Sequence, residues 1–270
     1  MILNEILLQK RKDLDELKQR MPLARLRRII EKSERTKPRS FHNALLATQH
    51  LNIIAELKKA SPSEGVLREN FQPLRIASLF EYAGACAISV MTEPHFFKGR
   101  PSYLKTVRQV TKLPLLRKDF IFDRFQLYET ALLEADAFLL IASILSEEEL
   151  KDLIALGKEL GMDALVEVHS DAELKKAVEA GAAIIGINNR DLKTLQVDPE
   201  RAKHLIPHIP KGIAIVVESG LKTHDELMMY KSLGANAFLI GSVLMRSKDI
   251  AATLQQLLGK KDVSIAEGAL

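Results

Sequence analysis

Residues 163–191 read DALVEVHSDAELKKAVEAGAAIIGINNRD and contain one full unit of the pattern that decides the fold. An apolar run over 163–169 ends in charged residues, a segment with helical apolar spacing covers 171–180, and a second apolar run begins at residue 184. Short apolar runs of this length predict buried strands, and the spacing between them predicts a helix. The stretch therefore predicts a strand–helix–strand unit.

The same unit recurs along the chain. Eight apolar runs begin at intervals of about 20 to 33 residues, and each finishes in polar or charged residues. They are IIAELK (53–58), CAISVMTE (86–93), LPLLRKDF (113–120), AFLLIAS (137–143), DALVEVH (163–169), IIGINNRD (184–191), IAIVVESG (213–220) and AFLIGSVLM (237–245). This alternation predicts an α/β fold, a (β/α)8 TIM barrel, in which the C-terminal strand ends converge on one mouth where active sites are built.

Length limits the number of domains. A barrel of this kind typically needs roughly 250 residues, so the 270 residues leave room for only a modest extension. We expect an N-terminal helical extension over 1–45 that packs on the barrel and covers one end of it. The barrel itself is expected over 46–258, followed by a frayed C-terminal tail over 259–270.

Composition excludes several classes of protein. Cys86 is the only cysteine, which rules out an internal disulfide framework and is typical of a reducing compartment. No charged n-region with an apolar core opens the sequence, and no apolar stretch is long enough for a membrane helix. Neither GxGxxG nor GxxxxGK[ST] occurs, which argues against dinucleotide and ATP sites of those kinds. We expect a cytoplasmic protein without a membrane partner.

Positive charge is concentrated near the N-terminus. Residues 1–40 hold 12 Lys and Arg against 6 Asp and Glu, whereas the whole chain carries a net charge of +4. A basic arm can bind nucleic acid. This arm lacks interleaved aromatic residues, and its apolar residues have the spacing of helices that dock on a barrel. Those residues are Ile2, Ile6, Leu7, Leu14, Leu17, Leu23, Leu26, Ile29 and Ile30. We therefore expect no nucleic-acid partner.

Charged residues at the strand ends predict a catalytic site. Side chains alternate across a strand, so Glu56 and Lys58 share a face and point into the mouth if Ile54 points into the barrel below them. The same register brings further residues to the mouth: Lys118, Glu167, Asn188, Glu218 and Ser242. Each could instead be a satisfied ion pair or a solvated strand end. Together, at the edge of an apolar interior, they predict acids and bases with perturbed pKa values.

Glycines after the last strands predict a phosphate site. Gly220 follows the seventh apolar run, and Gly241 and Ser242 lie where the eighth gives way to a helix. Barrels frequently bind phosphate with these loops, through backbone N–H groups. The first strand is the neighbour of the eighth, so Lys58 and Ser61, in the long loop over 61–65, could complete the pocket with a cation and a hydroxyl.

Other residues near the rim allow an apolar wall and argue against a metal. Phe97, in the loop over 93–101, together with Phe120, Leu139 and Leu192, could enclose an aromatic part of a substrate, although rim aromatics also serve as loop anchors. His95 and His169 could bind a metal, but no second ligand has a recognisable spacing, so we expect no metal.

The polar strand ends, taken in order, resemble the indole-3-glycerol phosphate synthase family. The matching segments are IIAELKKASPSEG (53–65), VMTEPHFFKG (90–99), LLRKDFIFDRFQ (115–126), ALVEVH (164–169), IGINNRDLKTL (185–195), VVESG (216–220) and AFLIGSVLM (237–245). They span the whole barrel, and the N-terminal helical extension is also expected of the family. The resemblance implies cofactor-free ring closure of 1-(2-carboxyphenylamino)-1-deoxyribulose 5-phosphate to indole-3-glycerol phosphate in tryptophan biosynthesis, with loss of carbon dioxide and water.

The resemblance also implies a role for each site residue. Lys118 resembles the general acid at the ribulose carbonyl, and Glu167 the partner in the later dehydration. Lys58 matches a residue that binds the substrate carboxylate or acts as a second acid, and Glu56 one that orients the lysines. The remaining matches are substrate positioning by Asn188, Arg190, Glu218 and Ser219, phosphate binding by Ser61, Gly220, Gly241 and Ser242, and an anthranilate wall of Phe97, Phe120, Leu139 and Leu192. Ala60 departs from members that carry a third lysine there, which shifts anion binding onto Lys58 and Arg190.

Three other functions remain as alternatives. Phosphoribosylanthranilate isomerase is also a phosphate-binding barrel, but its reaction is expected to use a cysteine near the first strand end, where this chain has Glu56 and Lys58. The others are a nucleic-acid-binding protein that uses the basic arm and a barrel that binds the ligand without turnover. We expect a phosphorylated small molecule as the ligand and a monomer, with a homodimer as the alternative.

Overall fold

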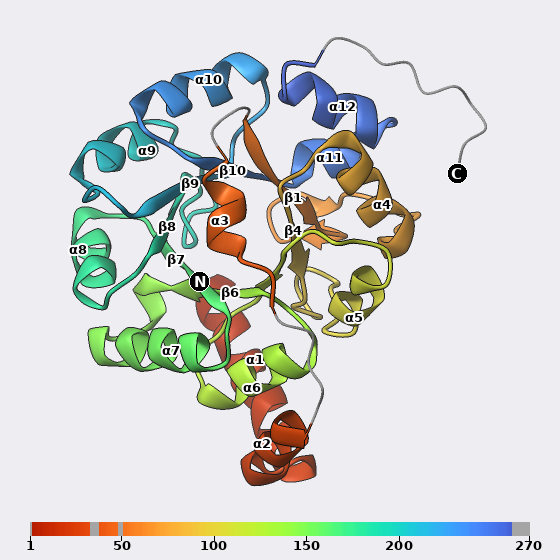
Figure 1. Cartoon of the computed structure of the whole chain (residues 1–270), viewed down its shortest axis with the longest axis vertical. Helices are drawn as coiled ribbons and strands as arrows, with labels where there is room; N and C mark the ends of the chain where they lie inside the picture. The colour runs from red at the N-terminus through yellow and green to blue at the C-terminus, as the bar shows by residue number, and fades with distance from the viewer. Residues whose placement is uncertain (1, 33–37, 48–50, 261–270) are drawn as a thin grey trace.

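The computed structural model describes residues 2–32, 38–47 and 51–260, and in them the predicted barrel is present. Eight parallel strands form a closed barrel in the order β1-β10-β9-β8-β7-β6-β5-β4. Figure 1 shows helices wrapped around this ring. The strands are β1 (Asn52–Leu57), β4 (Ala87–Met91), β5 (Leu115–Lys118), β6 (Ala137–Ile141), β7 (Asp163–Val168), β8 (Ile184–Asn188), β9 (Ala214–Glu218) and β10 (Ala237–Ile240). Each strand lies within one of the eight apolar runs, with β1 beginning one residue earlier.

Helices follow the strands as the sequence pattern predicts. The outer helices are α4 (Pro73–Ala83), α5 (Tyr103–Arg108), α6 (Arg124–Leu132), α7 (Glu147–Glu159), α8 (Asp171–Glu179), α9 (Glu200–Leu205), α10 (His224–Leu233), α11 (Ser242–Arg246) and α12 (Ile250–Leu257), with short 3-10 helices at Ala142–Ile144 and Ile206–His208. Several begin at side-chain caps, such as Ser146 before α7, which accepts a hydrogen bond from the Glu149 N–H. Capping satisfies backbone N–H groups that have no partner within the helix.

Alternation along β1 confirms the predicted register. Ile54 packs in the inner cluster of the barrel, while Ile53, Ala55 and Leu57 belong to the outer cluster between strands and helices. Both faces of the strands are thus buried, as expected for a parallel sheet covered by helices. The polar residues at the strand ends therefore face the mouth.

The N-terminal extension covers both ends of the barrel. It consists of α1 (Ile2–Arg20), α2 (Leu23–Lys32) and α3 (Phe41–Leu45). Ile2 at the start of α1 lines a cavity at the mouth. At the opposite end, the side chain of Asn52, the first residue of β1, donates hydrogen bonds to the carbonyls of Leu45 and Ala47. In Figure 1, α3 crosses the near end of the barrel and α1 runs behind it. The prediction that one end is covered was therefore too limited.

Basic residues of the extension dock it on the barrel. Lys10 Nζ lies 2.6 Å from Asp119 Oδ1, and Lys18 Nζ lies 2.6 Å from Asp123 Oδ2. The Arg11 guanidinium lies over the ring of Phe122, 5.0 Å from its centroid. Part of the local charge excess is thus used within the molecule. The predicted apolar face is wrong at Leu17, which is 39% exposed although Leu14 on the same helix is buried.

Three local predictions differ from the structure or lie outside the residues it describes. The loop over 61–65 is a small hairpin, in which β2 (Ala60–Ser61) pairs with β3 (Gly65–Val66). The sequence also predicts short helices over 42–48 and 71–83; they correspond to α3 and α4, and residue 48 lies outside the described residues. The frayed tail is expected over 259–270, and of this range residues 261–270 lie outside the residues that the structure describes. No helix of the described chain is long and apolar enough to cross a membrane.

Candidate active site

The predicted site residues converge on the mouth of the barrel. An open cavity lies there, and concave sites of this kind bind small ligands. The predicted residues that line it are Glu56, Lys58, Ser61, Phe97, Lys118, Phe120, Leu139, Glu167, Asn188, Arg190, Leu192, Glu218 and Ser219. Gly220, Gly241 and Ser242 line an adjoining hollow, which shares Lys58, Arg190 and Ser219 with the cavity. The structure thus brings the whole predicted set to one region.

Lys118 is the centre of a buried ionic cluster. Its Nζ, at the end of β5, lies 2.8 Å from Glu167 Oε2 of β7 and 3.1 Å from Glu218 Oε2 of β9. Both carboxylates are 1% exposed. Because the inner faces of three strands point these groups at one another, a single lysine serves two carboxylates in a water-poor site.

The environment moves the pKa values of the two carboxylates apart. Burial alone would raise the pKa of Glu167, but Lys118 and His169 hold it well below its usual range. Burial, with the Glu167 charge nearby, raises the pKa of Glu218 to about 7 even though Lys118 opposes this. Burial lowers the pKa of Lys118, yet the neighbouring carboxylates raise it above its ordinary value. At neutral pH the site therefore holds a protonated lysine, an ionised Glu167 and a Glu218 able to exchange a proton.

Two glycines make room for the buried carboxylates. A Cβ at Gly186 on β8 would lie 2.4 Å from Glu218 Oε1, and a Cβ at Gly241 would lie 2.4 Å from Glu56 Oε2. A side chain at either position would therefore push the carboxylate out of its present place. Gly241, singled out in the sequence for phosphate binding, is thus also required by Glu56.

Lys58 forms a second ion pair beside the first. Its Nζ lies 2.8 Å from Glu56 Oε2, and the lysine side chain is 15% exposed. Glu56 also contributes to the raised pKa of Lys118. The two lysines of the mouth are therefore linked through Glu56, and Lys58 is the one nearer to solvent.

An apolar wall closes the opposite side of the cavity. The rings of Phe97 and Phe120 lie 6.2 Å apart at their centroids and are tilted by 41°. Glu93 holds the Phe97 loop, because its carboxylate accepts hydrogen bonds from the backbone N–H groups of His95, Phe96 and Phe97. Leu139 and Leu192 line the same cavity. A planar apolar group can therefore bind against this wall.

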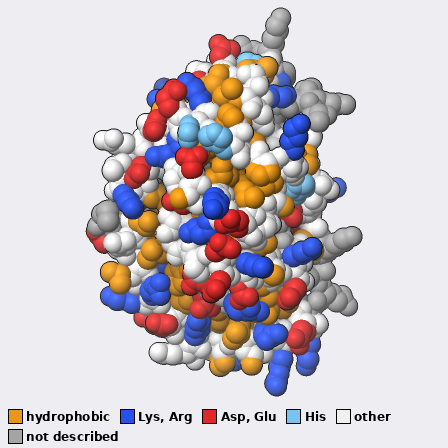
Figure 2. Space-filling model, turned by 90° about the vertical axis from the view of Figure 1, so that its left-hand side faces the viewer, with side chains coloured by type: hydrophobic (Ala, Val, Ile, Leu, Met, Phe, Trp, Pro, Cys, Tyr) orange, Lys and Arg blue, Asp and Glu red, His pale blue; other side chains and the backbone are white. Residues whose placement is uncertain are grey.

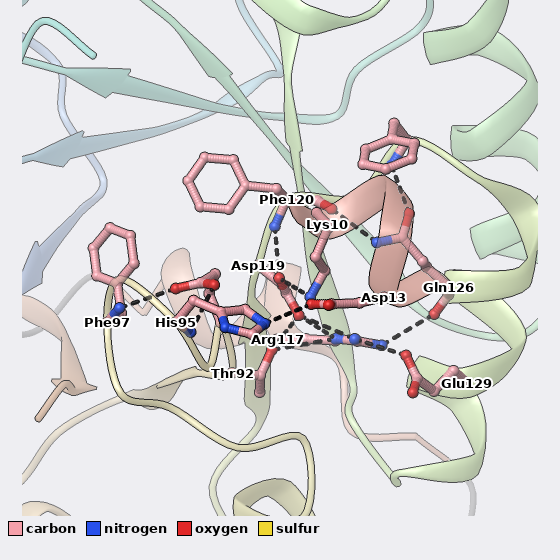
Figure 3. Close-up of polar contacts among 12 residues, drawn as sticks. Lys10, Asp13, Thr92, His95, Phe97, Arg117, Asp119, Phe120, Gln126 and Glu129 are labelled. Atoms are coloured by element: carbon pink, nitrogen blue, oxygen red, sulfur yellow. Dashed lines mark hydrogen bonds and ion pairs between the residues drawn. The ribbon is translucent and has the colours of Figure 1, made fainter. Parts of the chain in front are cut away.

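A polar network fixes the strand end that carries Lys118 and Phe120 (Figure 3). Asp119 is 1% exposed and accepts from Thr92 at 2.6 Å and from Arg117 at 3.0 Å, while Lys10 of α1 lies 2.6 Å from it. These partners hold the pKa of Asp119 well below its usual range in spite of burial. The extension is thus tied to the residue that follows Lys118.

The adjoining hollow has the features of an anion site, but a carboxylate already lies in it. Ser242 Oγ donates to Glu64 Oε2 at 2.5 Å, and Arg246 Nη2 lies 3.0 Å from Glu64 Oε1. Burial by itself would raise the pKa of the Glu64 carboxyl. The hydrogen bond from Ser242 and the charge of Arg246 outweigh burial, so the pKa is held below its ordinary value. Ser219 and Gly220 both have positive φ, 68° and 79°. This turn places backbone N–H groups near the hollow.

Not every predicted phosphate residue lies in that hollow. Ser61 lines the cavity that contains Lys118, where its Oγ lies 3.4 Å from Ser63 Oγ. Asn188 accepts the backbone N–H of Arg190, and the Arg190 guanidinium donates to the Leu195 carbonyl at 2.8 Å. Arg190 therefore borders both spaces with its side chain held in place.

Sequence reasoning missed residues that complete the site. Ile2, Leu3 and Ile6 of α1 line the cavity, and Glu64 and Arg246 line the hollow. The α1 residues could not be placed because nothing in the sequence says which end of the barrel a docked helix covers. The sequence did indicate Arg246, because it lies one helical turn after Ser242 and so on the same side of the helix.

A cluster of possible metal ligands lies away from the mouth. Within the described ranges, Asp171, His204 and His208 are the group of His and acidic side chains close enough to hold an ion. All three are exposed, and Figure 2 shows histidine beside acidic side chains on this outer face. They line neither the cavity nor the hollow. His95 and His169, the histidines considered from the sequence, pair with Asp13 and with Glu167 and Glu173 respectively.

Comparison with known families gives a match over nearly the whole chain. Residues 3–257 match the family model of indole-3-glycerol phosphate synthase. A protein of that name from Acetivibrio thermocellus is 45% identical over 95% of this chain and 98% of its own. One from Campylobacter jejuni is 47% identical over 96% of this chain and 100% of its own.

Solved structures of lower identity share the fold. The 3-hexulose-6-phosphate synthase from Salmonella typhimurium superposes with a TM-score of 0.63 at 15% identity, over 77% of this chain and 97% of that one. A tryptophan synthase α-subunit from Pyrococcus furiosus gives a TM-score of 0.59 at 15% identity, over 77% and 98%. At this identity the likeness concerns the fold alone.

Proposed function

The chain belongs to the indole-3-glycerol phosphate synthase family, and we propose that Lys118 and Glu167 carry the proton transfers of that family's reaction. The protein is a carboxy-lyase of tryptophan biosynthesis. It closes the ring of 1-(2-carboxyphenylamino)-1-deoxyribulose 5-phosphate and releases carbon dioxide and water. The observation that carries the assignment is the buried contact of 2.8 Å between Lys118 and Glu167 inside the cavity.

Lys118 acts first, as the general acid. The aryl carbon attacks the ribulose carbonyl, a carbon–carbon bond forms, and the carbonyl oxygen takes a proton from Nζ. The raised pKa keeps Lys118 charged in the resting site, and its ammonium also stabilises the negative charge that develops on the oxygen. Loss of carbon dioxide then returns the bonding electrons to the ring.

Glu167 acts in the later dehydration. The low pKa of Glu167 keeps it ionised, so it can accept the proton that leaves when the new double bond forms. The hydroxyl group departs as water after protonation by Glu218, whose pKa of about 7 leaves it partly protonated at neutral pH, because Lys118 has already given its proton to the carbonyl oxygen. Lys118 lies 2.8 Å from Glu167, and Glu218 lies 3.1 Å from Lys118.

The remaining residues bind and orient the substrate. Lys58, less buried than Lys118, binds the anthranilate carboxylate against the apolar wall until decarboxylation. Asn188 and Arg190 position the ribulose hydroxyls, with Ser219 beside them. The phosphate lies in the hollow of Ser242, which adjoins Lys58 and Arg190. Ser61, at the cavity edge, contributes a hydroxyl from the β2–β3 hairpin.

The proposal includes partners and location. The ligand is a phosphorylated small molecule, and neither nucleic acid nor a membrane is a partner, since basic residues of the extension are used in docking it to the barrel. The protein works as a monomer, with a homodimer as the alternative that light scattering would detect. A cytoplasmic location is supported by the single cysteine.

The function is tested with purified protein and the carboxyphenylamino-ribulose phosphate. Indole fluorescence and release of carbon dioxide should rise together, in equal amounts. Folded protein that binds the substrate without either signal would leave only a ligand-binding barrel. No binding and no product would contradict the function itself.

A further inference from the structure

His169 is a buried titratable residue that the proposed mechanism does not use. It follows β7 directly and lies two residues after Glu167, so the two side chains share the face that points into the mouth. Its side chain is 10% exposed. A buried histidine beside a reacting carboxylate needs an account of its own.

Glu173 clamps the imidazole of His169 from the outside. Glu173 Oε2 lies 3.1 Å from His169 Nδ1 and also accepts the backbone N–H of His169 at 2.8 Å. Glu173 is itself fixed in the first turn of α8, where its N–H donates to the capping side chain of Ser170. One ring nitrogen is therefore held, and the orientation of the ring is set.

The other ring nitrogen faces the free oxygen of Glu167. Lys118 contacts Oε2 of Glu167 at 2.8 Å, whereas Oε1 has no hydrogen bond within the described chain and lies 3.4 Å from His169 Nε2. The charges run in alternation from Glu173 through His169 and Glu167 to Lys118. His169 is thus the second cation beside Glu167.

A second cation matters when the first one reacts. As Lys118 gives its proton to the substrate, Glu167 loses its positive partner in a site that is 1% exposed to water. An unpaired buried carboxylate takes up a proton, which would remove the base needed for dehydration. Burial lowers the pKa of His169, but Glu167 and Glu173 raise it to about 9, so the imidazole is charged at neutral pH.

We infer that His169, clamped by Glu173, is a positioning residue that keeps Glu167 ionised and oriented while Lys118 delivers its proton. The charged groups around the imidazole are Glu167 on β7 and Glu173 on α8, with Lys118 on β5 and Glu218 on β9 beyond them. This role rests on the proposed function, because it presumes that Glu167 is the base. The contact between His169 and Glu167 does not depend on the proposed function, and it can be measured separately.

The contact is tested by NMR titration of the imidazole in the full-length protein. His169 should titrate near 9 in the wild type and move toward the ordinary histidine value of about 6.5 in Glu173→Gln and in Glu167→Gln. Glu179→Gln is the matched control, because Glu179 lies on the same helix and pairs only loosely with Lys175, at 3.8 Å. Titration of wild-type His169 near 6.5 would overturn the inference whether or not the protein turns over substrate.

The catalytic part is tested by kinetics of His169→Gln, with His169→Asn as the second variant if the first does not fold. We expect kcat to fall about tenfold with KM within about twofold, and the acid limb of the pH–kcat profile to move to higher pH. Loss of the imidazolium raises the pKa of Glu167, which explains the direction. Glu173→Gln should give a smaller change of the same kind, and Glu179→Gln none.

The outcomes separate the two claims. Wild-type kcat and an unmoved acid limb in a folded His169→Gln would overturn the positioning role, as would a lower kcat with an unmoved limb, which is the result of a purely structural effect. Absence of product from the wild type would instead contradict the proposed function, and the NMR titration would still decide the contact.

Discussion

The two halves of the mouth are built by different means. The half around Lys118 consists of charged side chains at strand ends, almost without exposure, that satisfy one another at 2.8 and 3.1 Å. The half around Ser242 consists of loop and helix ends, where backbone groups and half-buried side chains meet a single carboxylate from a hairpin, Glu64.

The two halves differ because proton transfer and phosphate binding need different groups. Proton transfer needs pKa values separated by fixed, buried charges, and strands hold such charges in place. Phosphate arrives already charged and needs donors that become free when it binds. In the proposed reaction the contacts of the strand half serve as they stand, whereas in the loop half Glu64 occupies donors that we propose the phosphate uses.

The largest effect in the strand half is expected from Glu167→Gln. Loss of the base should lower kcat roughly 100- to 10,000-fold, with little change in KM, because the amide keeps the shape but cannot accept the proton. Steady-state assays of product formation measure both constants. A kcat near that of the wild type would move the base to another residue.

A substitution in the loop half should change KM more than kcat. Ser242→Asp places a negative charge beside the phosphate and Glu64, and we expect KM to rise about tenfold with a smaller change in kcat. Gln256→Glu, on an exposed residue of α12, is the control for added charge. An unchanged KM in Ser242→Asp would place the phosphate elsewhere.

Removal of the resident carboxylate should act in the opposite direction. Glu64→Gln frees Ser242 and Arg246 from a charged partner, so KM should fall about threefold while kcat stays the same. Glu69→Gln, on a nearby exposed residue, is expected to change neither constant. A higher KM in Glu64→Gln would mean that this carboxylate supports the phosphate pocket instead of competing for it.

The smallest effect concerns stability. The pKa of Glu218 is raised from 4.5 to about 7 in the folded state, so the native protein holds this proton more tightly than the unfolded chain. The stability that the proton contributes is present below about pH 4.5 and is lost as the pH rises to about 7. Denaturant titrations at several pH values should show this loss in the wild type and a flatter profile in Glu218→Gln. Equal profiles would contradict the raised pKa.

The strand half was predictable from sequence because its rule is local. Side chains alternate with a period of two, so the position of Ile54 inside the barrel fixes the directions of Glu56 and Lys58. The same argument placed Lys118, Glu167 and Glu218. The barrel followed from the repeat of strand and helix.

The loop half and the extension were less predictable because their contacts are not local. Glu64 meets Ser242 across 178 residues, and Lys10 meets Asp119 across most of the extension and the first strands. No periodicity in the sequence indicates such long-range side-chain contacts. For the same reason the outward exposure of Leu17 could not be foreseen from helical spacing.

In the proposed mechanism the buried Lys118 delivers the proton for ring closure. The most direct measurement is the rate of indole-3-glycerol phosphate formation by Lys118→Met, beside Lys105→Met on the exposed surface of α5 as the control. We predict that Lys118→Met loses at least about 100-fold in kcat while the control keeps the wild-type rate. Equal rates for folded Lys118→Met and wild type would contradict the account.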